Sequence, residues 1–208
     1  MKTALILFAK APVPGHSKTR LIPALGEEEA ARVHELLVLR TLDSVAKLST
    51  DSGLLVIQMW GSAPHPKLEL WSRQYGWPLN IQQGVDLGER MSHALTSVLE
   101  EGVDKAVLIG SDCPMIDAHY VTEAINALDS SDVVLGPAED GGYVLVGCRR
   151  GTPKLFNGID WGTDRVLEQT VGAASDDQLG LTLLDTLWDV DRPEDWERFS
   201  LLLAAEKD

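Results

Sequence analysis

The chain has 208 residues and a net charge of −14, because 18 lysines and arginines stand against 32 aspartates and glutamates. Hydrophobic residues make up 44% of the sequence, which is ordinary for a globular core. Such an acidic chain offers no broad basic surface, which argues against nucleic acids and anionic membranes as partners.

Other sequence-wide features indicate a protein of the cytoplasm. Cys113 and Cys148 are too few for a disulfide framework or a zinc site. The N-terminus does not resemble a signal peptide, and no apolar run approaches the length of a transmembrane helix. We therefore expect one cytoplasmic domain over residues 1–208, without membrane insertion. The sequence leaves the oligomeric state open.

Strand and helix patterns alternate along the chain. The strand patterns cover residues 3–9, 54–59, 79–82, 106–109, 133–135, 143–146 and 179–184. The helix patterns cover residues 27–48, 66–75, 86–99, 117–128, 163–171 and 193–205. This alternation predicts an α/β sandwich with a mainly parallel sheet. Ligands of such sheets bind beyond the carboxyl ends of the strands.

A basic loop follows the first predicted strand and carries Lys10, Lys18 and Arg20. It is not a phosphate-binding P-loop, because Pro12 and Ser17 stand where that motif needs glycine. The cations, rather than a nest of backbone N–H groups, would therefore bind an anion. The alternative is a solvated surface loop with incidental charges.

Asp112 follows the most clearly buried strand pattern, residues 106–109. A carboxylate at that end of a strand is well placed to bind a hard cation such as Mg²⁺ or Mn²⁺. The alternative is an aspartate that caps a helix or stabilises a turn.

Asp140 lies between two strand patterns and precedes Gly141 and Gly142. The Asp-Gly pair favours a hairpin turn. In the context of a site, Asp140 could also accept hydrogen bonds from a sugar hydroxyl or act as a base.

Asp189 and Asp191 stand two residues apart before the last predicted helix. In an extended backbone they would point to the same side, where both could face a cation. Asp86 and Gly88 lie in a turn that opens a helix, whose free N–H groups could meet a phosphate or a ribose. Cys113 has no activating partner visible in the sequence, which argues against a nucleophile.

Acidic strand ends would repel a diphosphate, but a divalent cation reconciles an acidic pocket with an anionic substrate. Lys18 and Arg20 would add direct contacts. The combined pattern is typical of a site for a nucleotide-diphosphate donor.

Several motifs in this order resemble one family over nearly the whole chain. They span residues 8–15, 18–21, 86–91, 110–114, 140–143, 158–161 and 189–195. The family comprises bacterial glycosyltransferase-A-like proteins once grouped as a domain of unknown function, and it is associated with arsenosugar biosynthesis. The resemblance implies the three-layer α/β/α sandwich of nucleotide-diphospho-sugar transferases.

The resemblance also implies roles for single residues. Lys18, Asp112 and Asp140 are the catalytic candidates, and Asp112 and Asp191 are the metal candidates. The nucleotide-binding candidates are Ala9, Lys10, Gly15, Lys18, Arg20, Asp86 and Gly88. The substrate-binding candidates are Asp140, Gly141, Gly142 and Trp161.

The chain departs from the family's usual pattern at His16, Gly162 and Arg192. In addition, Asp112 is the single carboxylate of the triplet Ser111-Asp112-Cys113. The resulting hypothesis is an Mg²⁺- or Mn²⁺-dependent glycosyltransferase with a nucleotide-sugar donor and a small-molecule acceptor. The alternatives are a nucleotidyltransferase that acts on a phosphorylated small molecule and a non-catalytic nucleotide-binding module.

Overall fold

The computed structural model describes residues 1–48, 53–149 and 153–206. Its strands are β1 (Thr3–Ala9), β2 (Leu55–Gly61), β3 (Leu79–Ile81), β4 (Lys105–Ile109), β5 (Val133–Pro137), β6 (Tyr143–Arg149) and β7 (Leu181–Leu183). The α-helices are α1 (Ile22–Leu25), α2 (Glu27–Val45), α3 (Pro66–Tyr75), α4 (Leu87–Glu100), α5 (Ala118–Ala127), α6 (Val166–Asp176) and α7 (Pro193–Ala205). Two 3₁₀ turns are η1 (Thr19–Leu21) and η2 (Pro153–Phe156).

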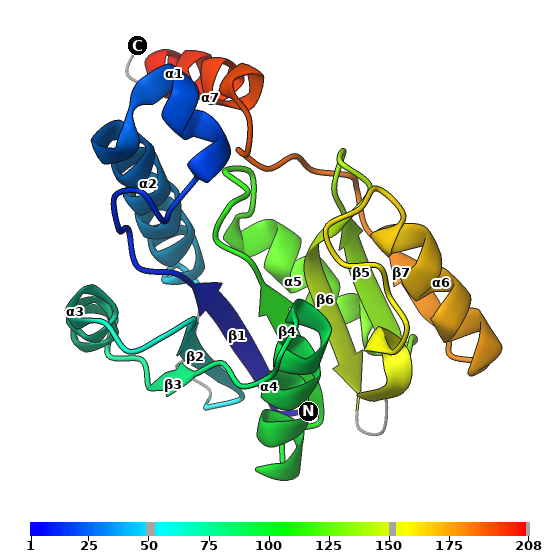
Figure 1. Ribbon diagram of the computed structural model, residues 1–208. Coiled ribbons are helices and arrows are strands. Elements are labelled where there is room, and N and C mark those ends of the chain that lie inside the picture. Colours follow the sequence, from blue (N-terminus) through cyan, green and yellow to red (C-terminus); the bar gives the residue numbers. More distant parts are fainter. Residues whose placement is uncertain (49–52, 150–152, 207–208) are drawn as a thin grey trace.

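The strands form one seven-stranded sheet in the order β3-β2-β1-β4-β6-β5-β7 (Figure 1). All pairs are parallel except those of β6, which runs antiparallel to both β4 and β5. The predicted α/β sandwich with a mainly parallel, mixed sheet is confirmed. Because β6 is reversed, its first residue lies at the same edge as the last residues of its neighbours.

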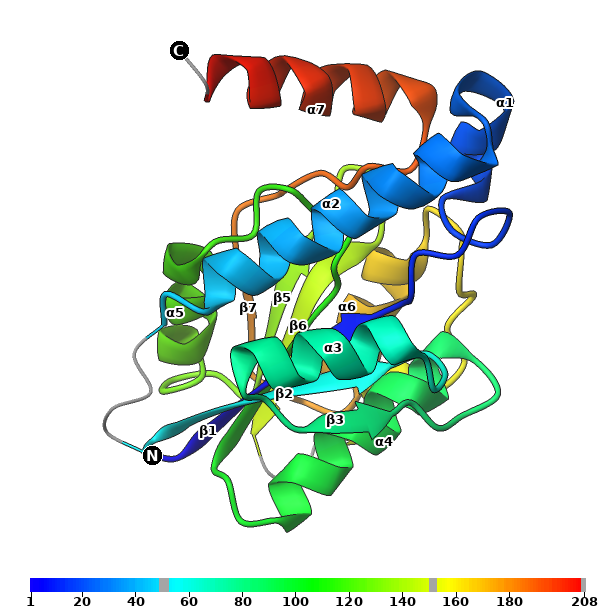
Figure 2. The same ribbon diagram turned by 90° about the vertical axis from the view of Figure 1, so that its left-hand side faces the viewer.

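Apolar side chains on the two faces of the sheet make two separate cores. On one face, α2, α3 and α5 pack against alternate strand residues such as Leu7 and Ile109. On the other face, α4, α6 and η2 pack against the intervening residues, among them Ile6 and Leu108. This in-and-out alternation follows from the period of two along a strand. It produces the three layers visible in Figure 2.

A third cluster lies beyond the sheet, where α2 extends past it toward α1 and α7 (Figure 2). Phe199 of α7 is fully buried there with Leu37 of α2 and Val190 of the preceding segment. This cluster fixes the C-terminal segment over the carboxyl ends of the strands, where it contributes to the site.

The structure differs from the sequence prediction at some elements. The short elements η1, α1 and η2 were not predicted, because four residues or fewer give no readable periodicity. Helix α6 begins at Val166 rather than at residue 163. In the described part of the chain, no helix has both the length and the apolar character needed to cross a bilayer.

Candidate functional site

A cleft of about 1090 Å³ opens at the carboxyl edge of the sheet. Four segments enclose it. We call them the first loop (residues 10–20), the β4 end (residues 110–114), the hairpin turn (residues 138–142) and the strap (residues 185–192), and each contributes lining residues. A fifth segment, the crossing loop (residues 157–165), adds Trp161 as a wall. The position agrees with the rule that ligands of such sheets bind at the strand ends.

The first loop is held by its own hydrogen bonds. The buried Ser17 hydroxyl accepts from the Val13 N–H at 3.0 Å and donates to the Ala11 carbonyl at 3.0 Å. The Lys10 ammonium group donates to the His16 carbonyl. The predicted basic loop is therefore an ordered turn, in which Lys10, His16 and Arg20 are exposed. Gly15 does not line the cleft.

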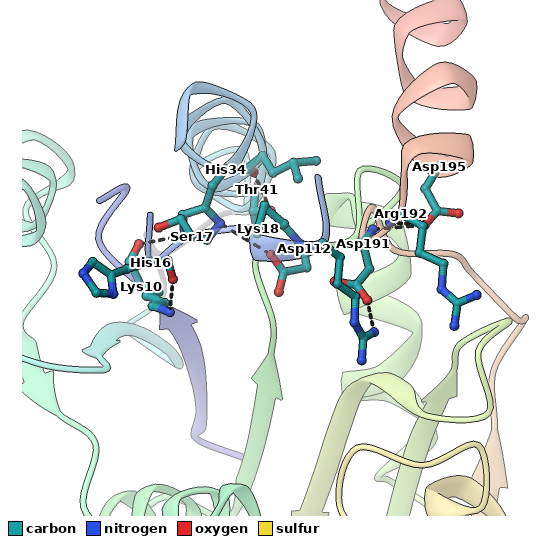
Figure 3. Close-up of polar contacts among 12 residues, drawn as sticks. Lys10, His16, Ser17, Lys18, His34, Thr41, Asp112, Asp191, Arg192 and Asp195 are labelled. Carbon is teal, nitrogen blue, oxygen red and sulfur yellow. Dashed lines mark hydrogen bonds and ion pairs between the residues drawn. The ribbon is translucent and has the colours of Figure 1, made fainter. Parts of the chain in front are cut away.

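Lys18 points into the cleft and pairs with Asp112 across it (Figure 3). Its Nζ lies 2.7 Å from Asp112 Oδ1, and its side chain is 6% exposed. Burial by itself would raise the pKa of Asp112, but Lys18 and His34 outweigh it and hold that pKa well below its ordinary value. The lysine predicted to bind phosphate and the aspartate predicted to bind metal therefore neutralise each other in this structure.

Arg20 and Asp191 form a second ion pair at the rim of the cleft. The backbone of Asp191 is fixed as well, because its N–H donates to the Asp195 carboxylate at 3.1 Å. Asp195 also accepts from the Arg192 N–H at 2.7 Å, which starts α7. The metal role of Asp191 stays a prediction, and the structure gives its carboxylate a different partner.

Asp189 is the strap residue that interacts with the carboxylates of the cleft. Burial, followed by the charges of Asp140 and Asp112, raises its pKa to about 6, against an opposing effect of Lys18. The strap is tied to the β4 end because the Val190 N–H donates to the Asp112 carbonyl at 3.0 Å. Asp189 and Asp191 both line the cleft with Asp112, and Asp191 is the one of the two that pairs with Arg20.

Asp140 has a structural role in addition to its place in the cleft. Its Oδ1 accepts from the Gly142 N–H at 2.9 Å, which closes the predicted turn between the antiparallel strands β5 and β6. Gly141 has φ of +88°, and its carbonyl accepts from the Leu167 N–H at 2.8 Å. The turn is thereby held against the start of α6.

Asp86 and Gly88 lie beside the cleft, since Leu87 between them lines it. The Asp86 carboxylate caps α4 by accepting from the Glu89 N–H at 2.8 Å. Gly88 lies under the Trp161 ring, so close that a Cβ there would come within 2.6 Å of it. Both residues line a smaller groove of about 570 Å³, and neither lines the cleft. Their predicted nucleotide contacts stay predictions.

Cys113 lines the cleft, but it is buried. Burial raises the pKa of its thiol to about 11, so the thiol stays protonated at neutral pH.

The carboxylates of the cleft fit a divalent cation only with help from a ligand. The described residues hold no preformed group of three or more metal-ligating side chains. Magnesium, however, is usually bound by one or two carboxylates together with substrate phosphates. Asp112 and Asp189 could supply that pair, with phosphate oxygens and water completing the shell.

His34 is a functional candidate that the sequence analysis did not identify. It lies on α2, is buried, and brings its Nδ1 to 3.6 Å from Asp112 Oδ1. In the sequence it is one of five scattered histidines without ligand spacing. A polar residue on the apolar face of a helix was the available signal, because it falls among Ala30, Val33 and Leu37.

Comparison with protein families gives a clear result. A family model described as "Uncharacterized protein conserved in bacteria (DUF2064)" matches residues 41–163, more than half of the chain. The chain belongs to this family. Among curated proteins, none matches the sequence.

Solved structures extend the comparison to the fold of this DUF2064 protein. A crystal structure from Desulfovibrio desulfuricans G20, provisionally called a nucleotide-diphospho-sugar transferase, is 33% identical with a TM-score of 0.83. The match covers 92% of this chain and 84% of that one. The nucleotide-diphospho-sugar transferase fold is therefore confirmed.

Two more distant structures share the fold alone. One is CMP:2-keto-3-deoxy-manno-octonic acid synthetase in complex with CTP, at 10% identity, TM-score 0.63, and coverage of 99% of this chain and 100% of that one. The other is glucosyl-3-phosphoglycerate synthase from Mycobacterium tuberculosis with Mn²⁺ and UDP, at 13% identity, TM-score 0.59, and coverage of 93% and 74%.

Proposed function

We propose that this protein is a metal-dependent glycosyltransferase that takes a sugar from a nucleotide-diphosphate donor. The observation that carries the proposal is the meeting of Lys18, Asp112 and Asp189 in one cleft at the carboxyl edge of the sheet. The 33% identical structure, provisionally called a nucleotide-diphospho-sugar transferase, supports the same class of substrate.

In this proposal, Asp112 and Asp189 hold a divalent cation, and the bound cation supplies charge stabilisation to the diphosphate. Lys18 leaves Asp112 and donates to a phosphate oxygen, where its charge stabilises the leaving group. Arg20 lies at the rim of the cleft and adds a second positively charged side chain beside Lys18. Asp140 orients a hydroxyl of the donor sugar or of the acceptor, from a turn that is already rigid.

The test is an incubation with nucleotide sugars or with nucleoside triphosphates, each with Mg²⁺ or Mn²⁺ and a panel of small acceptors. Release of a nucleoside diphosphate from a nucleotide sugar is the expected result. Release of pyrophosphate that requires a phosphorylated acceptor contradicts glycosyl transfer. Binding of nucleotides without reaction of any combination of donor and acceptor would indicate a non-catalytic nucleotide-binding module.

A nucleotidyltransferase is the second candidate, in which a phosphorylated small molecule attacks a nucleoside triphosphate. One observation favours it. Lys10, Lys18 and Arg20 all line the cleft from the first loop, and three basic side chains offer contacts to each phosphate of a triphosphate if Lys18 and Arg20 exchange their carboxylate partners for it. The pyrophosphate measurement above separates this reaction from glycosyl transfer.

A further inference from the structure

Arg192 is a positively charged side chain of the cleft that the fold itself does not explain. It is exposed, lines the cleft and stands at the N-cap of α7. Within the described part of the chain its guanidinium group has no acceptor, although Glu194 and Asp195 lie close in the sequence. Other described arginines do hold an acceptor with their side chains, namely Arg20, Arg32, Arg40, Arg73, Arg90, Arg165 and Arg198.

The position of Arg192 also carries two local costs. Serine, threonine, aspartate and asparagine are favoured at an N-cap because their side chains accept from a backbone N–H, and Arg192 makes no such bond. The helix dipole places partial positive charge at the same end, which disfavours a cation. Local rules that are broken in this way are expected at functional sites. The chain also departs from its family's usual pattern at this residue.

Figure 3 places Arg192 away from the lysine of the site. Lys18, Asp112, Asp191 and Arg192 follow one another across the view, so Asp191 stands between Arg192 and the Lys18 pair. Asp191 is itself paired with Arg20. A diphosphate at Lys18 and Asp112 would therefore meet Arg20 before Arg192, which leaves Arg192 for a second molecule.

The beginning of α7 is tied to the hairpin turn. Arg198 donates to the two carboxylate oxygens of Glu139, at 2.8 Å and 3.3 Å. Glu139 directly precedes Asp140, and Arg198 follows Arg192 by less than two helical turns. Both Asp140 and Arg192 line the cleft. A small molecule can therefore contact Asp140 with one end and Arg192 with the other.

We propose that Arg192 binds the acceptor, and that the acceptor carries a carboxylate or a phosphate group in addition to the hydroxyl that reacts. This inference rests on the proposed function, in which the donor diphosphate lies at Lys18 and Asp112. A guanidinium group is always protonated in proteins, and its planar pair of N–H donors matches either anionic group. In a chain with a charge of −14, an anionic acceptor needs such a local cation.

Glycerol, glycerate and glycerol 3-phosphate are matched probes, because they share a hydroxylated three-carbon chain and differ in the anionic group. Each is titrated into the protein with and without Mn²⁺ and a nucleoside diphosphate. The ¹H–¹⁵N signal of the Arg192 Nε group reports binding. One or both anions should shift this signal and glycerol should not, and the tighter of the two anions identifies the preferred group. No shift with either anion overturns the inference.

Arg192→Thr tests the residue itself. The affinity for the anionic probe should fall by about tenfold or more, because a charge-assisted pair of hydrogen bonds is lost. Without ligands, the melting temperature should rise by about 2–4 °C, because threonine caps the helix and the cation is gone. A lower melting temperature with unchanged anion affinity would make Arg192 a structural residue and overturn the inference.

Two further variants control this test. Arg192→Lys keeps the charge without the planar fork and should lose less affinity than Arg192→Thr. Arg73→Gln removes an exposed arginine of α3 that does not line the cleft, and it should leave the anion affinity unchanged. An equal loss in Arg73→Gln would mean that the anions bind non-specifically, which overturns the inference.

The failure of this inference is distinguishable from the failure of the proposed function. If no nucleotide sugar releases a nucleoside diphosphate, glycosyl transfer fails, and the Arg192 signal still shows whether an anion binds there. If transfer occurs but neutral and anionic acceptors react equally well, only the inference fails. An anion that displaces the nucleotide instead of binding beside it also overturns the inference, because Arg192 would then contact the donor.

Discussion

Lys18 combines two features that are rare for a lysine. Its backbone is left-handed, with φ of 48° and ψ of 48°, and its ammonium group is buried. A glycine would suit that backbone better, but it would carry no charge into the cleft. The ion pair with Asp112 offsets the cost of burying the ammonium group.

Asp112→Asn should separate the role of this carboxylate in binding from its role in stability. We expect Mn²⁺-dependent nucleotide binding to weaken by about a hundredfold, because the amide carries no charge toward the cation. We also expect a loss of about 1–3 kcal/mol in stability, since Lys18 stays buried without its counter-ion. Calorimetric titration and urea unfolding measure the two effects.

The exposed Asp176→Asn, at the end of α6, is the control and should change neither quantity. Unchanged metal and nucleotide affinity in Asp112→Asn would reduce Asp112 to a turn residue.

Asp189 should make the stability of the protein depend on pH near neutrality. Its pKa is raised to about 6, so the folded state binds the proton more tightly than the unfolded state. Its contribution to stability is therefore complete below about pH 4 and is lost as the pH rises through about 6.

Asp189→Asn removes this effect. At pH 7.5 with a chelator present, the variant should be more stable by about 1–2 kcal/mol, after allowance for solvent screening of a partly exposed carboxylate. The difference should disappear below about pH 4. Urea unfolding at several pH values gives the curve, and a difference that grows toward low pH would contradict the prediction.

The hairpin turn and the crossing loop meet at Gly141. A Cβ on Gly141 would lie 2.1 Å from the carbonyl oxygen of Asp164, and the backbone there has φ of +88°. Gly141→Ala should therefore cost at least about 2–3 kcal/mol in stability, from a backbone clash added to the strained φ.

Gly162→Ala is a matched control, because Gly162 has φ of +83° and open space around it. Gly162→Ala should lower the free energy of unfolding by about 1 kcal/mol, through backbone strain alone. Thermal unfolding of the two variants measures the difference, which isolates the contact between the turn and the loop. Similar losses of stability in the two variants would show that the contact between the turn and the loop contributes little to stability.

Phe199 is the most deeply buried side chain of helix α7. Phe199 is fully buried against α2 and the strap, whereas Leu201 on the same helix is 74% exposed. Phe199→Ala should cost about 3–5 kcal/mol in stability and should weaken nucleotide binding, because the strap loses its anchor. Leu201→Ala should stay within about 0.5 kcal/mol. Urea unfolding distinguishes them, and equal effects would mean that α7 is not anchored there.

The sequence predicted the elements and the edge of the sheet at which the site lies, because strand and helix periods are local properties. It did not distinguish Asp189 from Asp191. Their spacing predicts that both carboxylates point to the same side of an extended segment, and the resemblance implied Asp191 as the metal candidate. The tertiary pairing of Arg20 with Asp191 is what separates the two in the structure. His34 was not predicted because its partners, Lys10 and Asp112, lie far from it in the sequence and meet it only in the folded structure.

The family resemblance contributed what periodicity does not contain. It implied the three-layer sandwich, which the structure confirms. It also assigned the motifs to one site, but Gly15, Asp86 and Gly88 do not line the cleft. It did not predict that Lys18 pairs with Asp112 in the absence of substrate.

At the scale of the whole molecule, the charge of −14 opposes both folding and the approach of an anion. Raising NaCl from about 50 to about 500 mM screens this repulsion over short distances. We expect the melting temperature at pH 7.5 to rise with salt. Near pH 4.7, where the sequence has no net charge, the rise should vanish. A melting temperature that falls with salt at pH 7.5 would mean that attractive ion pairs dominate the electrostatics.

The pairing of Arg20 with Asp191 joins residues 171 positions apart. During synthesis, a bacterial ribosome adds about 5–20 residues per second, so roughly 10–30 s separate the appearance of these two partners. Until the strap leaves the ribosome, the nascent chain contains Lys18 and Asp112 but lacks Asp189 and α7. The cleft is therefore complete only after the segment that carries Asp189 and α7 has left the ribosome. A ribosome-stalled chain that ends before residue 185 should retain the β1–β2 pairing and bind no nucleotide.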